Sequence, residues 1–143
     1  STMKYGLVCL LAFVTTFAWA STSINASETA YIMQQINAYR ASFGLKPVQT
    51  SDETCRFAAI RAKEVASHFS HDGFNQRYQN HTLPYKPWSE VNENIAMTSD
   101  YKKVVDMWAH SPGHAKNMRA NTPYVCVARY GDYFAYLGMR PKS

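Results

Sequence analysis

The sequence predicts one α+β domain, in which helices pack on a small antiparallel sheet, and two patterns carry this prediction. Apolar residues recur at helical spacing in several segments before residue 120, whereas residues 124–139 alternate as in a β-hairpin. The chain has 143 residues, which suits one domain, and it contains no internal repeats or low-complexity tracts. Helices followed by a terminal hairpin are typical of the α+β class.

Residues 1–20 have the pattern of a secretory signal peptide. Lys4 is a short positive region, an apolar run follows it, and Ala18-Trp19-Ala20 is a small-x-small cleavage site. We interpret Met3 as the native start and Ser1-Thr2 as an expression scar. We therefore expect residues 21–143 to form a single mature domain that is secreted or periplasmic.

The alternative reading of this segment is a membrane anchor. The apolar run is short for a hydrocarbon core of about 30 Å, so a transmembrane anchor is not expected in the mature form. Cys9 lies inside the apolar run and not after it, which disfavours a lipoprotein anchor.

The first helix of the mature chain is expected from Ser27 to about Phe43. Its apolar face consists of residues at i, i+4, i+7 and i+11, namely Ile32, Ile36, Tyr39 and Phe43. Gly44 then ends the helix as its C′ residue. Residues 45–48 are expected to be an extended connector.

The second helix is expected to begin with a capping box, with Thr50 at the N-cap and Glu53 at N3. Its apolar stripe consists of Cys55, Ala58, Ala62, Ala66 and Phe69. The alanines predict a close approach to another element. Residues 75–88 are polar, contain two prolines, and are predicted to be an ordered loop.

The remaining elements follow in short succession. Residues 90–97 predict a short strand, and Ser99 or Asp100 begins a third helix whose apolar face is Val104, Val105 and Trp108. Ser111 is the predicted N-cap of a fourth short helix, with proline at its first position. The hairpin pairs Tyr124–Tyr130 with Tyr133–Met139 around Gly131-Asp132.

Charge and cysteine content narrow the possible partners and the compartment. Removal of Lys4 with the signal peptide lowers the net charge from +5 to +4, and the basic residues are dispersed. Nucleic acid is therefore not an expected partner, because its binding needs clustered Lys and Arg. Cys55 and Cys126 remain after processing, and an even pair in an exported chain predicts a disulfide, the alternative being two buried free thiols.

The chemistry-bearing side chains lie in three segments rich in Ser, Gly and Asn, and they are His71, Glu93 and His114. Imidazole is the main side chain that ligates a metal or moves a proton at neutral pH. His110 and His114 have the i, i+4 spacing of a zincin helix, but Ser111 stands between them where a glutamate is needed, and a proline interrupts the helix. We therefore assign His110 to the surface and interpret Ser111 as a helix cap, not a nucleophile.

Five segments in one order resemble the CAP superfamily, also called the SCP-like extracellular domain, and above all its short bacterial branch. They are Asn37-Ala38-Tyr39-Arg40, Arg61-Ala62-Lys63-Glu64, Phe69-Ser70-His71, Glu93-Asn94-Ile95-Ala96 and the run from Trp108 through Ser111-Pro112-Gly113-His114 to Asn117-Met118. The resemblance covers residues 27–140. It implies an α-β-α sandwich with a shallow cleft between helices and sheet.

The resemblance also implies a cleft tetrad of two histidines and two glutamates. His71, Glu93 and His114 match three of its members, and the place of the second glutamate falls at or next to Ser111. Asn92 departs from the family as well, since a glycine is common before the Glu-Asn pair. With one acid missing, a mechanism that needs two carboxylates is in doubt.

Three functions remain open at this stage. The first is a monomeric binding module whose cleft holds Zn²⁺ or another divalent cation through His71 and His114, with Glu93 assisting, and which contacts a lipid, cell-wall or protein ligand. The second is a metal-dependent hydrolase of peptides or cell-wall polymers, in which His71, Glu93 and His114 are catalytic. The third is a scaffold in which the same side chains brace the cleft without metal.

Overall fold

A computed structural model describes residues 17–143, with side chains from Ala26 onward. Residues 1–16, which carry most of the predicted signal peptide, lie outside the described residues. The signal peptide and its cleavage after Ala20 stay predictions. Between residues 17 and 143, no helix is both long enough and apolar enough to cross a membrane.

The sheet has three antiparallel strands, β1 (Trp88–Met97), β2 (Tyr124–Tyr130) and β3 (Tyr133–Pro141), in the order β1-β3-β2. The predicted hairpin is therefore confirmed, and Gly131 turns it with a φ of +59°. The predicted strand near residue 90 is confirmed as β1, which pairs with β3 and forms one edge of the sheet.

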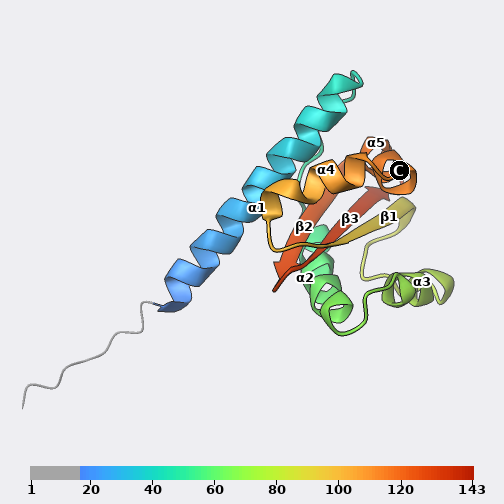
Figure 1. The fold of residues 1–143 in the computed structure, drawn as a ribbon. Helices are drawn as coiled ribbons and strands as arrows, with labels where there is room; N and C mark the ends of the chain where they lie inside the picture. Colours follow the sequence, from blue (N-terminus) through green and yellow to red (C-terminus); the bar gives the residue numbers. More distant parts are fainter. Residues whose placement is uncertain (1–16) are drawn as a thin grey trace, which may run out of the picture.

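Helices cover both faces of this sheet (Figure 1). Helices α1 (Phe17–Ser42), α4 (Val104–Ala109) and α5 (Pro112–Arg119) lie on one face, and a short 3₁₀ turn, Tyr101–Lys103, leads into α4. Helix α2 (Asp52–Ser67) packs on the other face, and α3 (Asp72–Gln79) follows it. The predicted α+β class and the α-β-α sandwich implied by the resemblance are thus confirmed.

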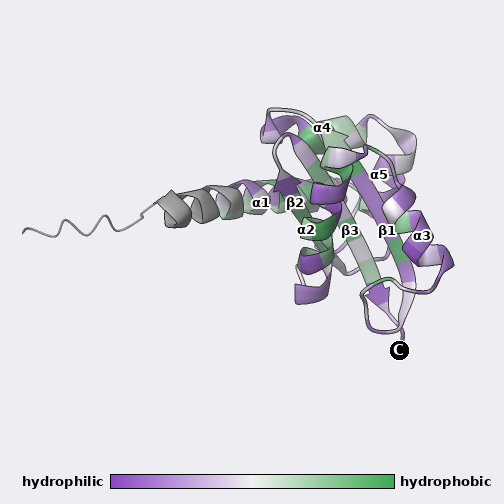
Figure 2. Ribbon diagram, turned by 90° about the horizontal axis from the view of Figure 1, so that it is seen from below, coloured by the Kyte–Doolittle hydropathy of each residue, from purple (hydrophilic) through white to green (hydrophobic). Residues whose placement is uncertain are grey.

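The alternation of the strands divides the core in two. Phe134 and Tyr136 of β3 face α1 and α4, whereas Ala135 and Leu137 face α2. Ala58 and Ala62 of α2 are buried against this second face, as the predicted close approach requires. In Figure 2, α2 and α4 carry green, apolar stretches, while α3 is mostly purple.

Four details of the predicted helices differ from the structure. Helix α1 begins at Phe17, so Ser27 lies inside it and is not its cap. Helix α2 is capped by Ser51, with Thr54 as its N3 partner, and not by Thr50 with Glu53. The segment predicted as a loop contains α3. Two apolar residues of the predicted stripes are exposed at the helix ends, namely Phe43 and Phe69.

The disulfide between Cys55 and Cys126 is present and joins the first turn of α2 to the middle of β2. The alternative of two free thiols is thereby excluded. Gly44 has a φ of +71° directly after α1, which is the left-handed conformation expected of a C′ glycine. Of the two residues predicted to begin the third helix, Ser99 and Asp100, it is Asp100 that caps the turn before α4.

Candidate cleft site

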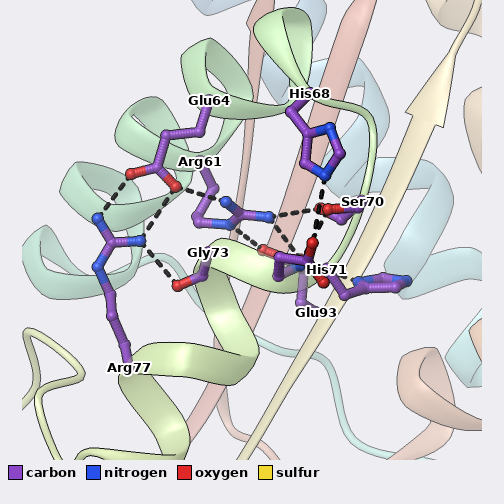
Figure 3. Close-up of polar contacts among 9 residues, drawn as sticks. Arg61, Glu64, His68, Ser70, His71, Gly73, Arg77 and Glu93 are labelled. Carbon is purple, nitrogen blue, oxygen red and sulfur yellow. Dashed lines mark hydrogen bonds and ion pairs between the residues drawn. The ribbon is translucent and has the colours of Figure 1, made fainter.

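The centre of the site is a buried ion pair between Arg61 of α2 and Glu93 of β1. Arg61 Nε donates to Glu93 Oε2 at 2.6 Å, and Arg61 Nη2 lies 3.1 Å from Glu93 Oε1. The side chains are 2% and 1% exposed. Glu93 Oε1 also lies 2.9 Å from Nδ1 of His71, so both carboxylate oxygens are occupied (Figure 3).

The same arginine connects the site to α3. Its guanidinium contacts Glu64, whose carboxylate in turn accepts from Arg77 of α3 at 2.6 and 3.0 Å. Arg61 Nη2 further donates to the carbonyl of Ser70 at 2.9 Å, which fixes the turn that carries His71. Figure 3 shows Arg61 lying between the Glu64–Arg77 pair and the Glu93–His71 pair.

His114 is positioned from the other face of the sheet by two carboxamides. Asn94 Nδ2 donates to the backbone carbonyl of His114 at 3.0 Å. Asn117 Nδ2 donates to Asn94 Oδ1 at 2.8 Å and to the carbonyl of Glu93 at 3.1 Å. Helix α5 is thereby held against the edge strand, and the rings of His71 and His114 lie 6.4 Å apart between centroids.

Two groups of the site have shifted pKa values. Burial, and then the nearby His71, lower the pKa of His114 from its usual 6.5, so its imidazole stays neutral to lower pH. Burial by itself lowers the pKa of Arg61, but the hydrogen bonds and charges of Glu93 and Glu64 outweigh it and the net shift is upward. Arg61 therefore remains a cation in the protein interior.

The other candidate residues of the sequence are exposed or have a structural role. His68 is 72% exposed and pairs with Asp72, and His110 is 77% exposed beside Asp106, in agreement with a surface role. Ser111 occupies the N-cap position of α5, but its side chain makes no capping hydrogen bond. Its carbonyl instead accepts from Ala115 in the first turn.

The side chains can be tested against the donor set of a zinc site. Among residues 26–143, no three His, Cys, Asp or Glu side chains converge as a metal-binding group. Two imidazoles on one tetrahedral Zn²⁺, each with Zn–N of about 2.0–2.1 Å, have ring centres about 5 Å apart. The observed 6.4 Å between the ring centroids of His71 and His114 exceeds that separation, so the two rings would ligate one ion only after moving closer together.

Arg61, Asn94 and Asn117 are the residues whose roles sequence reasoning missed. All three belong to the motif segments quoted above, yet no function was assigned to them. The available signal was the place of Arg61 three residues after Ala58, beside the predicted stripe of alanines, since a charge on an apolar helix face needs a partner.

Comparison with known proteins agrees with the fold. The sequence profile of the cysteine-rich secretory protein family, CAP, matches residues 33–134. This chain therefore belongs to the CAP family. No curated protein sequence matches it.

Three solved structures that share the fold come from bacteria. An extracellular protein containing an SCP domain from Bacillus anthracis superposes with a TM-score of 0.71 at 23% identity, and a cysteine-rich secretory protein from Staphylococcus aureus with 0.66 at 16%. These matches cover 83% and 81% of this chain but 42% and 39% of those chains. The chain thus spans about two fifths of their length.

A third structure is of similar size. An outer surface protein from Borrelia burgdorferi superposes with a TM-score of 0.57 at 17% identity, covering 81% of this chain and 94% of that chain. At these identities the three structures establish the shared CAP fold.

Proposed function

We propose that this CAP domain is an extracellular binding module whose cleft holds a divalent cation between His71 and His114 and presents it to a ligand. The contacts of Glu93 carry the proposal. Its two oxygens already accept hydrogen bonds from Arg61 and His71. Glu93 therefore orients the imidazole of His71 through Nδ1 and does not itself ligate the cation. The hydrogen bond at Nδ1 leaves Nε2 of His71 as the nitrogen for binding.

Zn²⁺ is the first candidate, because imidazole is among its preferred ligands and it accepts further oxygen ligands from water or a bound molecule. A site with only two protein ligands is weak and exchangeable. That property suits a cation that is shared with a lipid, cell-wall or protein ligand, as expected from the sequence, more than one that serves as a permanent structural centre.

Calorimetric titration of the full chain with Zn²⁺ tests this function. We expect one site per chain that is lost in His71→Ala and in His114→Ala. His68→Ala and His110→Ala are matched controls, since both rings lie outside the pair, and they should retain binding. Unchanged binding in His71→Ala and His114→Ala would refute the site, and no binding to the wild-type chain would favour the scaffold without metal.

The hydrolase alternative requires a carboxylate that is free to take a proton from water. Glu93 is the carboxylate beside His71 in the cleft. Its oxygens already accept hydrogen bonds from Arg61 and His71, which favours binding over hydrolysis. We expect no chelator-sensitive turnover of peptides or peptidoglycan. Such turnover, together with its loss in Glu93→Gln, would establish the hydrolase instead.

A secreted or periplasmic location belongs to the same proposal. It is supported by the disulfide, which persists in oxidising compartments, and by the extracellular and outer-surface proteins that share the fold. Mass spectrometry of the exported protein should find a chain that starts at Ser21.

A further inference from the structure

The cleft opens on either side of the histidine pair into two different hollows. The polar hollow, about 310 Å³, is lined by His71, Phe74, Asn75, Asn92, Glu93 and Asn117. The apolar hollow, about 350 Å³, is lined mainly by Phe69, Ile95, Met97, Met107, Trp108 and His114. Each histidine borders one hollow, and their rings lie 6.4 Å apart, so the two hollows adjoin at the imidazoles.

The apolar hollow gathers exposed apolar side chains from three separate elements. Phe69 follows α2, Met97 ends β1 and Met107 lies on α4, and they are 50%, 54% and 41% exposed. Isolated exposed apolar residues are ordinary, but a concave cluster of them marks a binding surface. Methionine adapts its shape to different apolar groups, which suits a pocket for one large side chain.

The polar hollow offers neutral hydrogen-bonding groups and no net negative charge. The Asn75 carboxamide is exposed. The charge of Glu93 is balanced by Arg61 in a buried pair. An anionic group on a ligand is therefore not repelled here, and the proposed cation at the imidazoles would attract it.

The edge of the sheet restricts how a peptide can bind. Strand β1 is an edge strand, and such edges commonly pair with an extended peptide. Here the carbonyls of Glu93 and Ile95 already accept from Asn117 Nδ2 and Trp108 Nε1, at 3.1 and 3.0 Å. A peptide at this edge is consequently recognised through one of its side chains and its terminus, and not by pairing with β1 as an added strand.

We propose that the cleft binds the C-terminal residue of a peptide. Its apolar side chain occupies the apolar hollow, its carboxylate lies at the His71–His114 pair, and the preceding amide lies in the polar hollow. Each hollow is near the lower limit of ligand cavities, which span about 300–1,000 Å³, and so suits one residue more than a long acyl chain. The inference rests on the proposed cation for the charge that attracts the carboxylate.

Calorimetry on the full chain with Zn²⁺ present tests this inference. The probes are an N-acetylated tetrapeptide that ends in leucine, its C-terminal amide, and the same tetrapeptide ending in serine. We expect the leucine acid to bind at least ten-fold more tightly than either of the other two. Equal affinity for leucine and serine, or for acid and amide, would overturn the proposal, as would binding of palmitate without binding of the leucine acid.

Variants of the apolar hollow test whether it is the source of the preference for leucine over serine. Met97→Ser with Met107→Ser should abolish the preference for leucine over serine. The matched control is Phe43→Ser with Ile60→Ser, two exposed apolar residues outside the cleft, which should keep it. The Zn²⁺ titration without peptide reads the cation site separately, so Zn²⁺ binding without peptide selectivity refutes this inference alone.

Discussion

At the residue scale, Arg61 determines what Glu93 does in the cleft. A carboxylate that is 1% exposed and held on both oxygens behaves as a fixed counter-charge. It orients His71 and has no free oxygen to offer a metal or a substrate. The second acid that the resemblance implies is missing, and the first acid is engaged by Arg61 and His71. Both observations support the proposed binding through the imidazoles over hydrolysis.

Glu93→Ala should destabilise the domain by about 3–5 kcal/mol, because it leaves the Arg61 cation buried without its partner. Urea unfolding measures the change. The control is Glu90→Ala, which breaks the half-exposed Glu90–Arg140 pair on the same strand and should cost about 0–1 kcal/mol. Similar losses of unfolding free energy in the two variants would show that the buried pair stabilises the domain no more than the half-exposed pair.

The lowered pKa of His114 can be measured by NMR titration of its ring. The midpoint should lie below 6.5, and His71→Ala should raise it, because the charge of His71 contributes to the shift while burial remains. Since the fold disfavours the charged ring, protonation destabilises it, and the free energy of unfolding should fall as pH drops below about 6.5. A midpoint above 6.5 would contradict the described burial.

Gly73 is required by the packing of the site. A methyl group there would overlap the Arg61 guanidinium and the Glu64 carboxylate, so Gly73→Ala should cost about 1–3 kcal/mol and weaken Zn²⁺ binding. Gly113→Ala is the matched control. It lies beside His114 on α5 with open space around it, and helix propensity predicts a neutral or slightly stabilising effect. Unfolding and calorimetry of both variants decide the point.

Asn92 shows how a departure from the family is accommodated. It pairs in register with Gly138 of β3, and a side chain at Gly138 would overlap its carboxamide. Because Gly138 has no side chain, the Asn92 carboxamide occupies the space beside it.

At the element scale, the predictions succeeded where a local pattern determines the element. The hairpin and α4 have clear alternation or helical spacing. Helix α3 was missed because only Phe74 and Tyr78 of its eight residues are apolar and Gly73 lies in its first turn. It is held by contacts distant in sequence, the burial of Phe74 and the Arg77–Glu64 pair, which a local pattern does not contain.

The start of α2 was ambiguous for a different reason. Two pairs have the spacing of a capping box, namely Thr50 with Glu53 and Ser51 with Thr54. The sequence alone is compatible with either pair as the start of the helix. The structure selects Ser51, because Glu53 instead accepts the backbone N–H of Lys86 at 2.7 Å and ties the following loop to α2.

The link between α2 and β2 can be tested through the disulfide. Reduction of Cys55–Cys126, which lie 71 residues apart, should lower the free energy of unfolding by about 2–4 kcal/mol. Urea unfolding with and without reductant measures it. The double variant Cys55→Ala/Cys126→Ala should be insensitive to reductant, and a wild-type chain equally insensitive would contradict the bond.

At the scale of the whole molecule, the cleft exists because two layers of helices meet at one sheet edge. Helix α2 brings Arg61 to one face of β1, and α5 brings His114 and Asn117 to the other. Arg40 of α1 stabilises this arrangement from outside the cleft, donating to the carbonyls of Met118 and Ala120 at the end of α5. The motif order predicted which segments converge, whereas the engagement of Glu93 by Arg61 depends on packing across the sheet.

The central claim is that the imidazoles bind a cation while Glu93 stays on Arg61. The most direct measurement is a crystal structure of the protein after soaking in Zn²⁺. We predict one ion at about 2.0–2.1 Å from Nε2 of His71 and from the ring of His114, with the carboxylate of Glu93 still paired to Arg61. An ion ligated by Glu93, or no ion between the two histidines at saturating Zn²⁺, would contradict the account.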